Sequence, residues 1–316
     1  MATKSGNATQ SELDYDVLII GGGPAGLSIA LQLGRSLRSV LVCDDNEPRN
    51  GPAAEAHGYL TRDGIDPQEL RRLGREEVTG YGGEFRDAQV TNIATAQDRF
   101  TSTLDAGETV TSRKVVLATG ISDVLPDTDG FEELWGNGVY HCPYCHGYEV
   151  RNEPLGVLVT NEHMIEYAKL IYNLNDDLVV FTNGQDIFDK KTRSAFVERG
   201  IEIEDKPINA LNGSNGLESV SLTDGREIAR HALFYPPPMT QHSKLAEKLG
   251  LQVNAAGLVE AGQSEHGIGF TSIDGLFVAG DASDASVLSI PSAVADGHNV
   301  GATINMELSQ EVFENG

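Results

Sequence analysis

Residues 15–37 read YDVLIIGGGPAGLSIALQLGRSL. The apolar run from Tyr15 to Ile20 leads into three glycines, and apolar residues then recur at helical spacing from Pro24 to Leu37. Val40 to Cys43 is a second short apolar run of the kind that forms a buried strand. The pattern therefore predicts a strand, a turn, a helix and a strand, which make a parallel βαβ unit of about thirty residues.

The turn between the first strand and the helix satisfies the pattern G-x-G-x-x-G. Its candidate phosphate-contacting residues are Gly21, Gly23, Pro24, Ala25 and Gly26. Glycines at this spacing let backbone N–H groups approach a pyrophosphate at the positive end of the helix dipole. Asp44 and Asp45 follow at the end of the next strand, where a carboxylate can accept hydrogen bonds from ribose hydroxyls, and we favour Asp44. The alternative is a tight turn that binds no nucleotide.

The same order of elements recurs later in the chain, with strands expected at 155–160 and 178–182 and a helix at 164–174. Short alternating strands follow each unit. The repetition predicts an α/β protein with two Rossmann-like dinucleotide-binding domains, each with three layers built on a parallel sheet plus a β-meander, the second inserted in the first. The expected boundaries, listed in chain order, are a disordered arm at 1–14, a first domain at 15–124 and 239–316, and an inserted domain at 125–238.

The amino-acid composition limits the kinds of partner that the protein can bind. The chain has 47 acidic and 23 basic residues and a formal net charge of -24, which repels nucleic acid and anionic lipid. No apolar run approaches the roughly 20 residues of a membrane-spanning helix, and residues 1–12 lack the apolar stretch of a secretory signal. We therefore expect a cytoplasmic protein without nucleic acid or membrane partners, with the solvated acidic surface found in proteins of high-salt cytoplasm.

Flavin and nicotinamide cofactors share the glycine pattern, so two further segments choose between them. Leu117 to Gly120 reads LATG and ends a strand, and Phe277 to Ser283 reads FVAGDAS and ends another near the C-terminus. In flavoprotein disulfide reductases, the first segment closes over the adenosine side and the Asp of the second holds the ribityl chain and pyrophosphate. The three motifs in this order predict FAD.

Residues 141–149 read HCPYCHGYE and form the candidate redox centre. Two thiols three positions apart, Cys142 and Cys145, can form a small-ring disulfide, and a thiolate beside a protonated His or a helix N-terminus is reactive near neutral pH. The alternative is half of a zinc site with His141 and His146 as nitrogen ligands. Structural zinc ligands usually come as two spaced pairs, so dithiol chemistry and no metal is the favoured interpretation. The third cysteine, Cys43, is expected to be a buried strand residue.

The motifs GGGPAG, LATG, CPYC and FVAGDAS, in this order over about residues 15–308, resemble those of the low-molecular-weight thioredoxin reductases. The resemblance implies that Cys145 faces the flavin, that Cys142 attacks the substrate disulfide and that Asp281 holds the ribityl chain. The other flavin contacts that we expect are Asn50, His57, Val90, Thr119, Gly120, Gly280, Ser289 and Ile290. We also expect a homodimer, and a thioredoxin-like protein or a small dithiol or disulfide as substrate.

Two departures from that family bear on function. His146 stands where the family usually has an Asp that acts as general acid, and His141 is the competing acid–base candidate. The turn of the second unit, residues 159–164, reads VTNEHM without a glycine, and FTNG at 181–184 replaces the basic cluster expected for a 2'-phosphate. Side chains at Thr160 to Glu162 should block the approach of a pyrophosphate to the backbone. The sequence therefore predicts FAD without efficient use of NADPH.

Three functions stay open at this point. The chain also resembles the flavin-dependent oxidases that form disulfides in small molecules with oxygen as acceptor. It resembles equally the thioredoxin-reductase-like proteins that take electrons from another donor, such as ferredoxin. A flavin-bound redox sensor is the non-enzymatic alternative.

Overall fold

The computed structural model describes residues 13–96, 99–265, 267–283 and 287–315. Most of the expected N-terminal arm, residues 1–12, lies outside them. Asp14, expected in the arm, exchanges hydrogen bonds with Thr111: its backbone N–H donates to Thr111 Oγ1, and its carboxylate accepts from the Thr111 N–H at 2.8 Å. Asp14 is therefore tied to the folded sheet.

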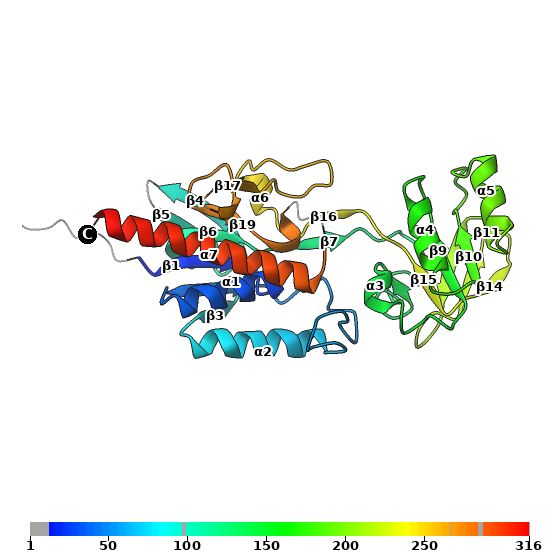
Figure 1. Ribbon diagram of the computed structural model, residues 1–316, viewed down its shortest axis with the longest axis horizontal. Helices are drawn as coiled ribbons and strands as arrows, with labels where there is room; N and C mark the ends of the chain where they lie inside the picture. Colours follow the sequence, from blue (N-terminus) through cyan, green and yellow to red (C-terminus); the bar gives the residue numbers. More distant parts are fainter. Residues whose placement is uncertain (1–12, 97–98, 266, 284–286, 316) are drawn as a thin grey trace, which may run out of the picture. The chain divides into compact units, whose positions relative to one another are not determined.

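The chain divides into two compact units (Figure 1). The first comprises residues 1–47, 71–121 and 241–316, and the second comprises 48–70 and 122–240. The segment 48–70, which we expected in the first domain, therefore packs with the second unit. The chain passes between the units through α2 (Pro67–Gly80) and through the paired strands β7 (Ile121–Asp123) and β16 (Met239–Gln241).

The first unit contains the predicted βαβ unit, whose two strands lie between β6 and β3 in the sheet. The strands β1 (Tyr15–Ile20) and β2 (Val40–Asp44) are parallel, with Val17 opposite Val40, and α1 (Pro24–Arg35) connects them. The sheet order is β17-β18-β19-β6-β1-β2-β3, and β4 and β5 form a meander beside β6. The other elements are β3 (Glu84–Asp87), β4 (Val90–Ala96), β5 (Arg99–Leu104), β6 (Thr109–Leu117), α6 (Leu245–Lys248), β17 (Gly262–Ser264), β18 (Gly267–Phe270), β19 (Leu276–Val278), the short 3-10 helix η1 (Gly280–Ala282) and α7 (Ile290–Asn315).

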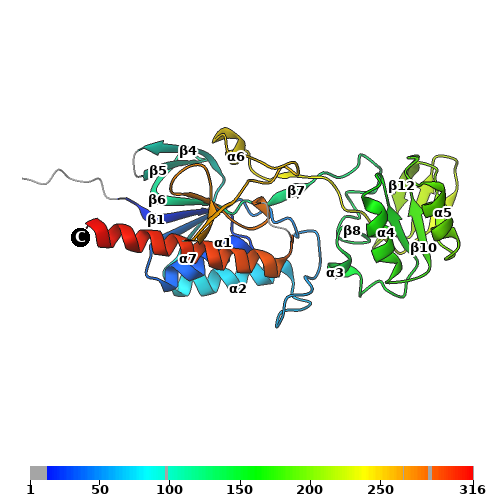
Figure 2. The same cartoon turned by 45° about the horizontal axis from the view of Figure 1, so that its top comes forward.

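The core of the first unit forms on both faces of this sheet. Odd-numbered apolar residues of β1, such as Val17 and Ile19, pack with α1 and α7, whereas Leu18 and Ile20 pack with the meander on the other face. Burial on both faces explains why β1 is a continuous apolar run rather than an alternating one. In Figure 2, α1 and α7 run side by side along the sheet.

The second unit repeats the arrangement on a smaller scale. Its parallel sheet has the order β11-β10-β9-β15-β8, and a separate antiparallel meander consists of β12, β13 and β14. Its elements are β8 (Val139–Tyr140), α3 (Pro143–His146), β9 (Leu155–Leu158), α4 (Met164–Tyr172), β10 (Leu178–Phe181), α5 (Lys190–Val197), β11 (Glu202–Glu204), β12 (Ile208–Asn212), β13 (Ser219–Leu222), β14 (Glu227–Ala229) and β15 (Ala232–Phe234). The predicted fold class, two Rossmann-like units of mixed α/β structure, is confirmed. No helix among the described residues is long and apolar enough to cross a membrane.

The contact between α1 and α7 depends on a glycine, which yields a stability prediction. A Cβ added at Gly297 of α7 would lie 2.3 Å from the carbonyl oxygen of Ala25, so the two helix backbones approach too closely for any side chain. Gly297→Ala should therefore lower the free energy of unfolding by about 1–3 kcal/mol. The matched control is Gly80→Ala at the end of α2, where an added Cβ would meet no described atom within 4 Å. That control should be neutral or stabilising by up to about 1 kcal/mol in urea unfolding, and equal destabilisation of both variants would contradict the prediction.

Candidate active site

The glycine turn of the first unit forms a cradle at the N-terminus of α1. Gly21 has φ +106°, and a Cβ there would lie 2.2 Å from the carbonyl oxygen of Ala118, so the turn can pass β6 only with glycine. A Cβ at Gly26 would lie 1.9 Å from the carbonyl oxygen of Gly21. Gly23 differs, because an added Cβ would meet no described atom within 4 Å. The space in front of Gly23 and the helix N-terminus therefore fits a pyrophosphate.

Asp44 lies beside this cradle and has a partner that the sequence did not reveal. A Cβ at Gly22 would lie 2.6 Å from Asp44 Oδ2, so the carboxylate reaches the turn. The same oxygen accepts a hydrogen bond from the guanidinium of Arg71 on α2. Asp45 pairs with Nε2 of His242 at 2.9 Å. Asp44 is thus the better placed of the two acidic residues, and Arg71 holds its carboxylate in position.

The structure distributes the other expected flavin contacts over both units, and each of these assignments stays a prediction. Those in the first unit are Val90 at the start of β4, Thr119 and Gly120 after β6, Gly280 and Asp281 in η1, and Ser289 and Ile290 at the start of α7. Asn50 and His57 belong to the second unit. The Gly280 N–H donates to Asp296 Oδ2 of α7 at 2.6 Å, which fixes the end of β19 to that helix.

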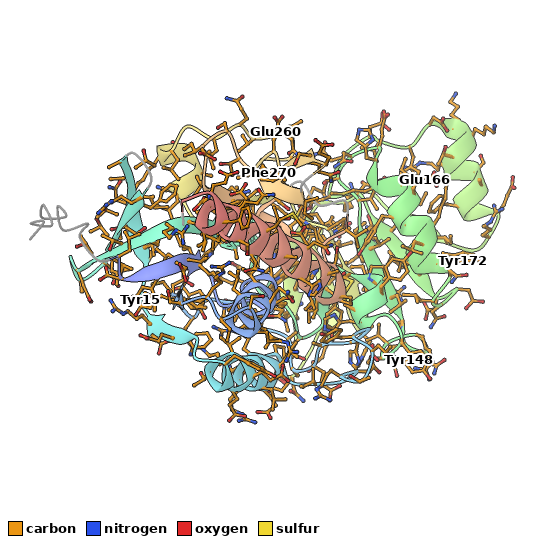
Figure 3. The ribbon with its side chains drawn as sticks, turned by 60° about the vertical axis from the view of Figure 1, so that its left-hand side comes forward. Tyr15, Tyr148, Glu166, Tyr172, Glu260 and Phe270 are labelled. Atoms are coloured by element: carbon orange, nitrogen blue, oxygen red, sulfur yellow. A yellow bond between two sulfur atoms is a disulfide. The ribbon has the colours of Figure 1, made fainter. Side chains whose placement is uncertain are left out.

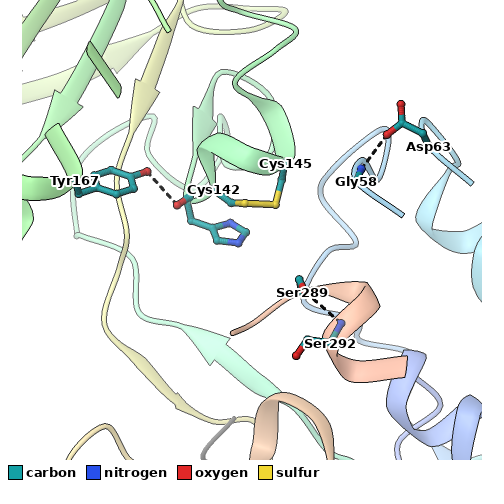
Figure 4. Close-up of a disulfide and its surroundings, with 8 residues drawn as sticks. Gly58, Asp63, Cys142, Cys145, Tyr167, Ser289 and Ser292 are labelled. Carbon is teal, nitrogen blue, oxygen red and sulfur yellow. Dashed lines mark hydrogen bonds between the residues drawn. A yellow bond between two sulfur atoms is a disulfide. The ribbon is translucent and has the colours of Figure 1, made fainter. Parts of the chain in front are cut away.

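The two cysteines of the candidate redox centre form a disulfide in the second unit (Figure 4). Cys142 is the N-cap of α3, Pro143 is its first residue, and the Cα atoms of Cys142 and Cys145 are 5.2 Å apart. The Tyr167 hydroxyl of α4 donates to the carbonyl oxygen of His141 at 3.0 Å and so anchors the segment before the disulfide. Among the described residues no group of three or more His, Cys, Asp or Glu side chains could hold a metal ion. Cys43, in the first unit, is a free buried thiol whose pKa is raised by burial to about 11.

His146 has an unusual environment for a buried polar side chain. Its ring stacks on Tyr140, with centroids 4.5 Å apart and planes at 13°. Both ring nitrogens are buried, and neither has a hydrogen-bond partner within the described parts of the chain. Burial lowers the pKa of His146, the charge of His57 lowers it further, and Glu149 opposes them. His146 is therefore a neutral imidazole near neutral pH, with nitrogens available to exchange a proton.

His141 is held more firmly in the neutral form. Its ring stacks on Trp135 with centroids 6.0 Å apart. Burial lowers the pKa of His141 to about 4, with help from the nearby Arg49 guanidinium and against the opposing effect of Asp123. Arg49 itself forms a two-bond ion pair with Asp123, at 3.0 and 2.8 Å. Because His141 takes up a proton only in acid, His146 is the better acid–base candidate.

The turn of the second unit that corresponds to the glycine cradle is filled by its own side chains. The Thr160 N–H points at the Met164 sulfur, 3.4 Å away, and the His163 N–H donates to Asn161 Oδ1 at 3.0 Å. Glu166 lies in the first turn of α4 and pairs with Lys169 (Figure 3). The amides of Thr160 and His163 therefore already have acceptors, and an acidic residue, Glu166, lies in the first turn of the helix.

The guanidinium near the end of the neighbouring strand β10 is already paired with a carboxylate. Arg193 of α5 makes two hydrogen bonds to the Asp205 carboxylate, at 2.9 and 2.8 Å. The Thr182 hydroxyl donates to the same carboxylate at 3.2 Å. These bonds to Arg193 lower the pKa of Asp205, so its carboxylate is charged. A 2'-phosphate would have to compete with Asp205 for Arg193.

A family model described as pyridine nucleotide-disulphide oxidoreductase matches residues 15–297. The chain belongs to this family. A probable thioredoxin reductase of Arthroderma benhamiae is 32% identical over 95% of this oxidoreductase and 82% of the relative. Thioredoxin reductase sirT of Leptosphaeria maculans is 33% identical over 93% of this chain and 94% of its own.

Solved structures agree with these relatives. The crystal structure of HlmI matches with a TM-score of 0.88 at 34% identity and covers 98% of this chain and 97% of HlmI. A putative thioredoxin reductase TrxB from Bacillus anthracis has a TM-score of 0.88 at 29% identity, over 94% of this chain and 99% of that one. The protein is therefore an enzyme, a thioredoxin-reductase-like flavoprotein disulfide oxidoreductase, and its family implies FAD.

The cradle yields a prediction about flavin content. Gly23 has extended backbone angles (φ -76°, ψ -176°) that any residue can adopt, so Gly23→Val should fold while its side chain fills the expected pyrophosphate space. We expect the purified variant to lose the yellow flavin absorbance and to keep the far-UV circular dichroism of the wild type. Gly23→Ala, with a smaller side chain, should show partial loss. A Val variant with a full complement of FAD would show that the pyrophosphate lies elsewhere.

The stacking of His141 on Trp135, the only tryptophan of the sequence, allows a pH prediction. Tryptophan fluorescence should change with a midpoint near pH 4, the lowered pKa of His141, and His141→Phe should remove this transition. In the unfolded chain His141 binds a proton at the ordinary histidine pKa, whereas in the folded protein it stays neutral until about pH 4. The free energy of unfolding should therefore decrease as the pH falls from about 6.5 towards 4. A transition that persists in His141→Phe would assign it to another group.

Proposed function

We propose that the protein transfers electrons between FAD and the Cys142–Cys145 pair, and between that pair and a thiol or disulfide substrate, without efficient use of NADPH. The observation that carries this proposal is the filled turn at residues 159–164. In the first unit, glycines leave space at the same point of the fold, whereas in the second unit Met164 and Asn161 supply the acceptors. The net charge of -24 also opposes binding of an anionic dinucleotide.

The dithiol chemistry follows from the disulfide and the neutral histidine. A substrate thiolate attacks Cys142 Sγ, which forms a mixed disulfide and releases the Cys145 thiolate. The second substrate thiolate then displaces Cys142, so the substrate leaves as a disulfide and both cysteines are reduced. FAD, when bound, would supply the two-electron acceptor that returns the Cys142–Cys145 dithiol to the disulfide. His146 accepts the proton of an attacking thiol or returns it to a leaving thiolate.

The direction of electron flow separates the two forms of this proposal. In the first form, electrons enter from a small dithiol and pass to oxygen. The protein is then a dithiol oxidase, and the nucleotide turn binds no NADPH. The alternative is a reductase that passes electrons from another donor, such as ferredoxin, to a thioredoxin-like protein, and the relatives named thioredoxin reductase support such a substrate. A redox sensor that performs no turnover is the third case. The cytoplasmic homodimer with a high-salt type of acidic surface stays a prediction.

Anaerobic reduction of the flavin tests the proposal. Stopped-flow mixing with dithiothreitol should bleach the flavin, whereas NADPH and NADH at micromolar concentrations should leave it oxidised. Reduced ferredoxin, in a separate mixing, tests the reductase form. Fast, saturable bleaching by NADPH would overturn the proposal and indicate an NADPH-dependent reductase. Oxygen consumption with a dithiol in air would identify the oxidase, and the absence of any turnover would indicate the sensor.

Two variants serve as controls for the route through the disulfide. Cys142→Ser and Cys145→Ser should each abolish bleaching by dithiothreitol, because neither retains the disulfide. Long-wavelength charge-transfer absorbance should appear only in Cys142→Ser, which retains Cys145. The reverse pattern would exchange the roles of the two cysteines.

A further inference from the structure

The loop between β2 and α2 brings a second histidine to the dithiol segment. Within this loop Ala56 pairs with Ile65, and the Gly58 N–H donates to Asp63 Oδ1 at 2.8 Å, as Figure 4 shows. These bonds fix the loop on either side of His57. The His57 ring lies edge-on to the ring of His146, with centroids 6.4 Å apart and planes at 86°. The two imidazoles are neighbours although 48–70 and 122–240 are separate segments of the second unit.

Three carboxylates surround His57. Glu55 Oε2 and Glu149 Oε1 lie 3.4 and 3.6 Å from Nε2, and Asp63 Oδ1 lies 3.5 Å from Nδ1. The side chain of His57 is only 15% exposed, so the solvent screens these interactions incompletely. A protonated His57 is therefore matched by negative charge on both sides of its ring.

Glu149 connects this cluster to the redox centre. It follows His146 by three residues and reaches Nε2 of His57. The titratable groups that face His146 are thus His57, Glu149, His141 and, beneath the ring, Tyr140. A positive charge on His57 disfavours a second one on His146, whereas the carboxylate of Glu149 favours it. Burial has the largest effect on the pKa of His146, and the two charged neighbours shift that pKa in opposite directions.

We propose that His57 and Glu149 are positioning residues that act through His146, with His57 adding to the effect of burial that keeps this ring neutral and Glu149 opposing it. The inference rests on the proposed acid–base role of His146. In the step concerned, a thiol S–H bond breaks, an N–H bond forms on the His146 ring and a thiolate remains, so a proton moves and no electrons do. His57 keeps the ring able to accept that proton at slightly acidic pH.

The test combines an NMR titration with kinetics. In protein labelled with carbon-13 at histidine, the His146 resonance, assigned through His146→Gln, is followed against pH in the oxidised enzyme. His57→Gln should move the His146 midpoint to higher pH, and Glu149→Gln should move it to lower pH. The rate of disulfide reduction by dithiothreitol at pH 6 should fall in His57→Gln by at most about fourfold, because burial still lowers the pKa of His146 and a histidine of ordinary pKa is about one-quarter neutral at that pH.

One variant serves as a control, and two different results would contradict the two proposals. His231→Gln alters an exposed histidine of the same unit and should reproduce the wild-type midpoint and rate. An unmoved or jointly moved His146 midpoint in the two variants would overturn the inference, because a merely structural role would not shift the midpoint in opposite directions. A normal exchange rate in His146→Gln would instead remove the proposed role of His146, whatever the midpoints show.

Discussion

The close approach of the first turn to the neighbouring strand is the constraint on which the cofactor-binding unit depends. Gly21 passes so near the carbonyl oxygen of Ala118 that no side chain fits, and Gly26 passes equally near Gly21. Because the turn is this tight, α1 starts directly at the carboxyl ends of β1 and β6. The segments that follow β6 and β19 begin at this same edge of the sheet, because β6 is parallel to both β1 and β19. The close approach at Gly21 thus places three motifs that are far apart in the sequence around one helix N-terminus.

The second unit uses the same fold without this constraint. Its turn from β9 to α4 has no glycine. The side chains of Asn161 and Met164 instead accept hydrogen bonds from N–H groups of the turn itself. At the next strand, Asp205 neutralises Arg193. The second unit has α3, which follows β8 and carries the disulfide beside two histidines. Two units of similar fold therefore differ in what they suit: the first has a turn open to a dinucleotide, and the second carries the disulfide.

The sequence predicted the parts of this arrangement that depend on local pattern. The βαβ units, the glycine turn and the Cys142–Cys145 pair follow from spacing and residue type over short stretches. The sequence did not predict the pairing of Asp44 with Arg71 or of His57 with Glu149, because each joins residues far apart in the chain and each partner alone resembles an ordinary surface charge. Nor did it reveal that residues 48–70 pack with the second unit, since this loop carries no periodic apolar pattern. The acidic residues Glu55 and Asp63, set at short spacing around His57, were the one local signal available.

The late position of α7 has a consequence for how the chain folds during synthesis. Helix α1 completes its packing only against α7, which includes residues as late as Val300 and Leu308 in the common core. The core of the first unit therefore cannot close until the residues of α7 have been synthesised. The second unit needs nothing beyond residue 240, so it can become compact earlier. During that interval the apolar faces of β1 and α1 lack a partner, and contacts of such long sequence separation form slowly. Helix α1 and strand β1 thus wait longer for their packing partner than any element of the second unit does.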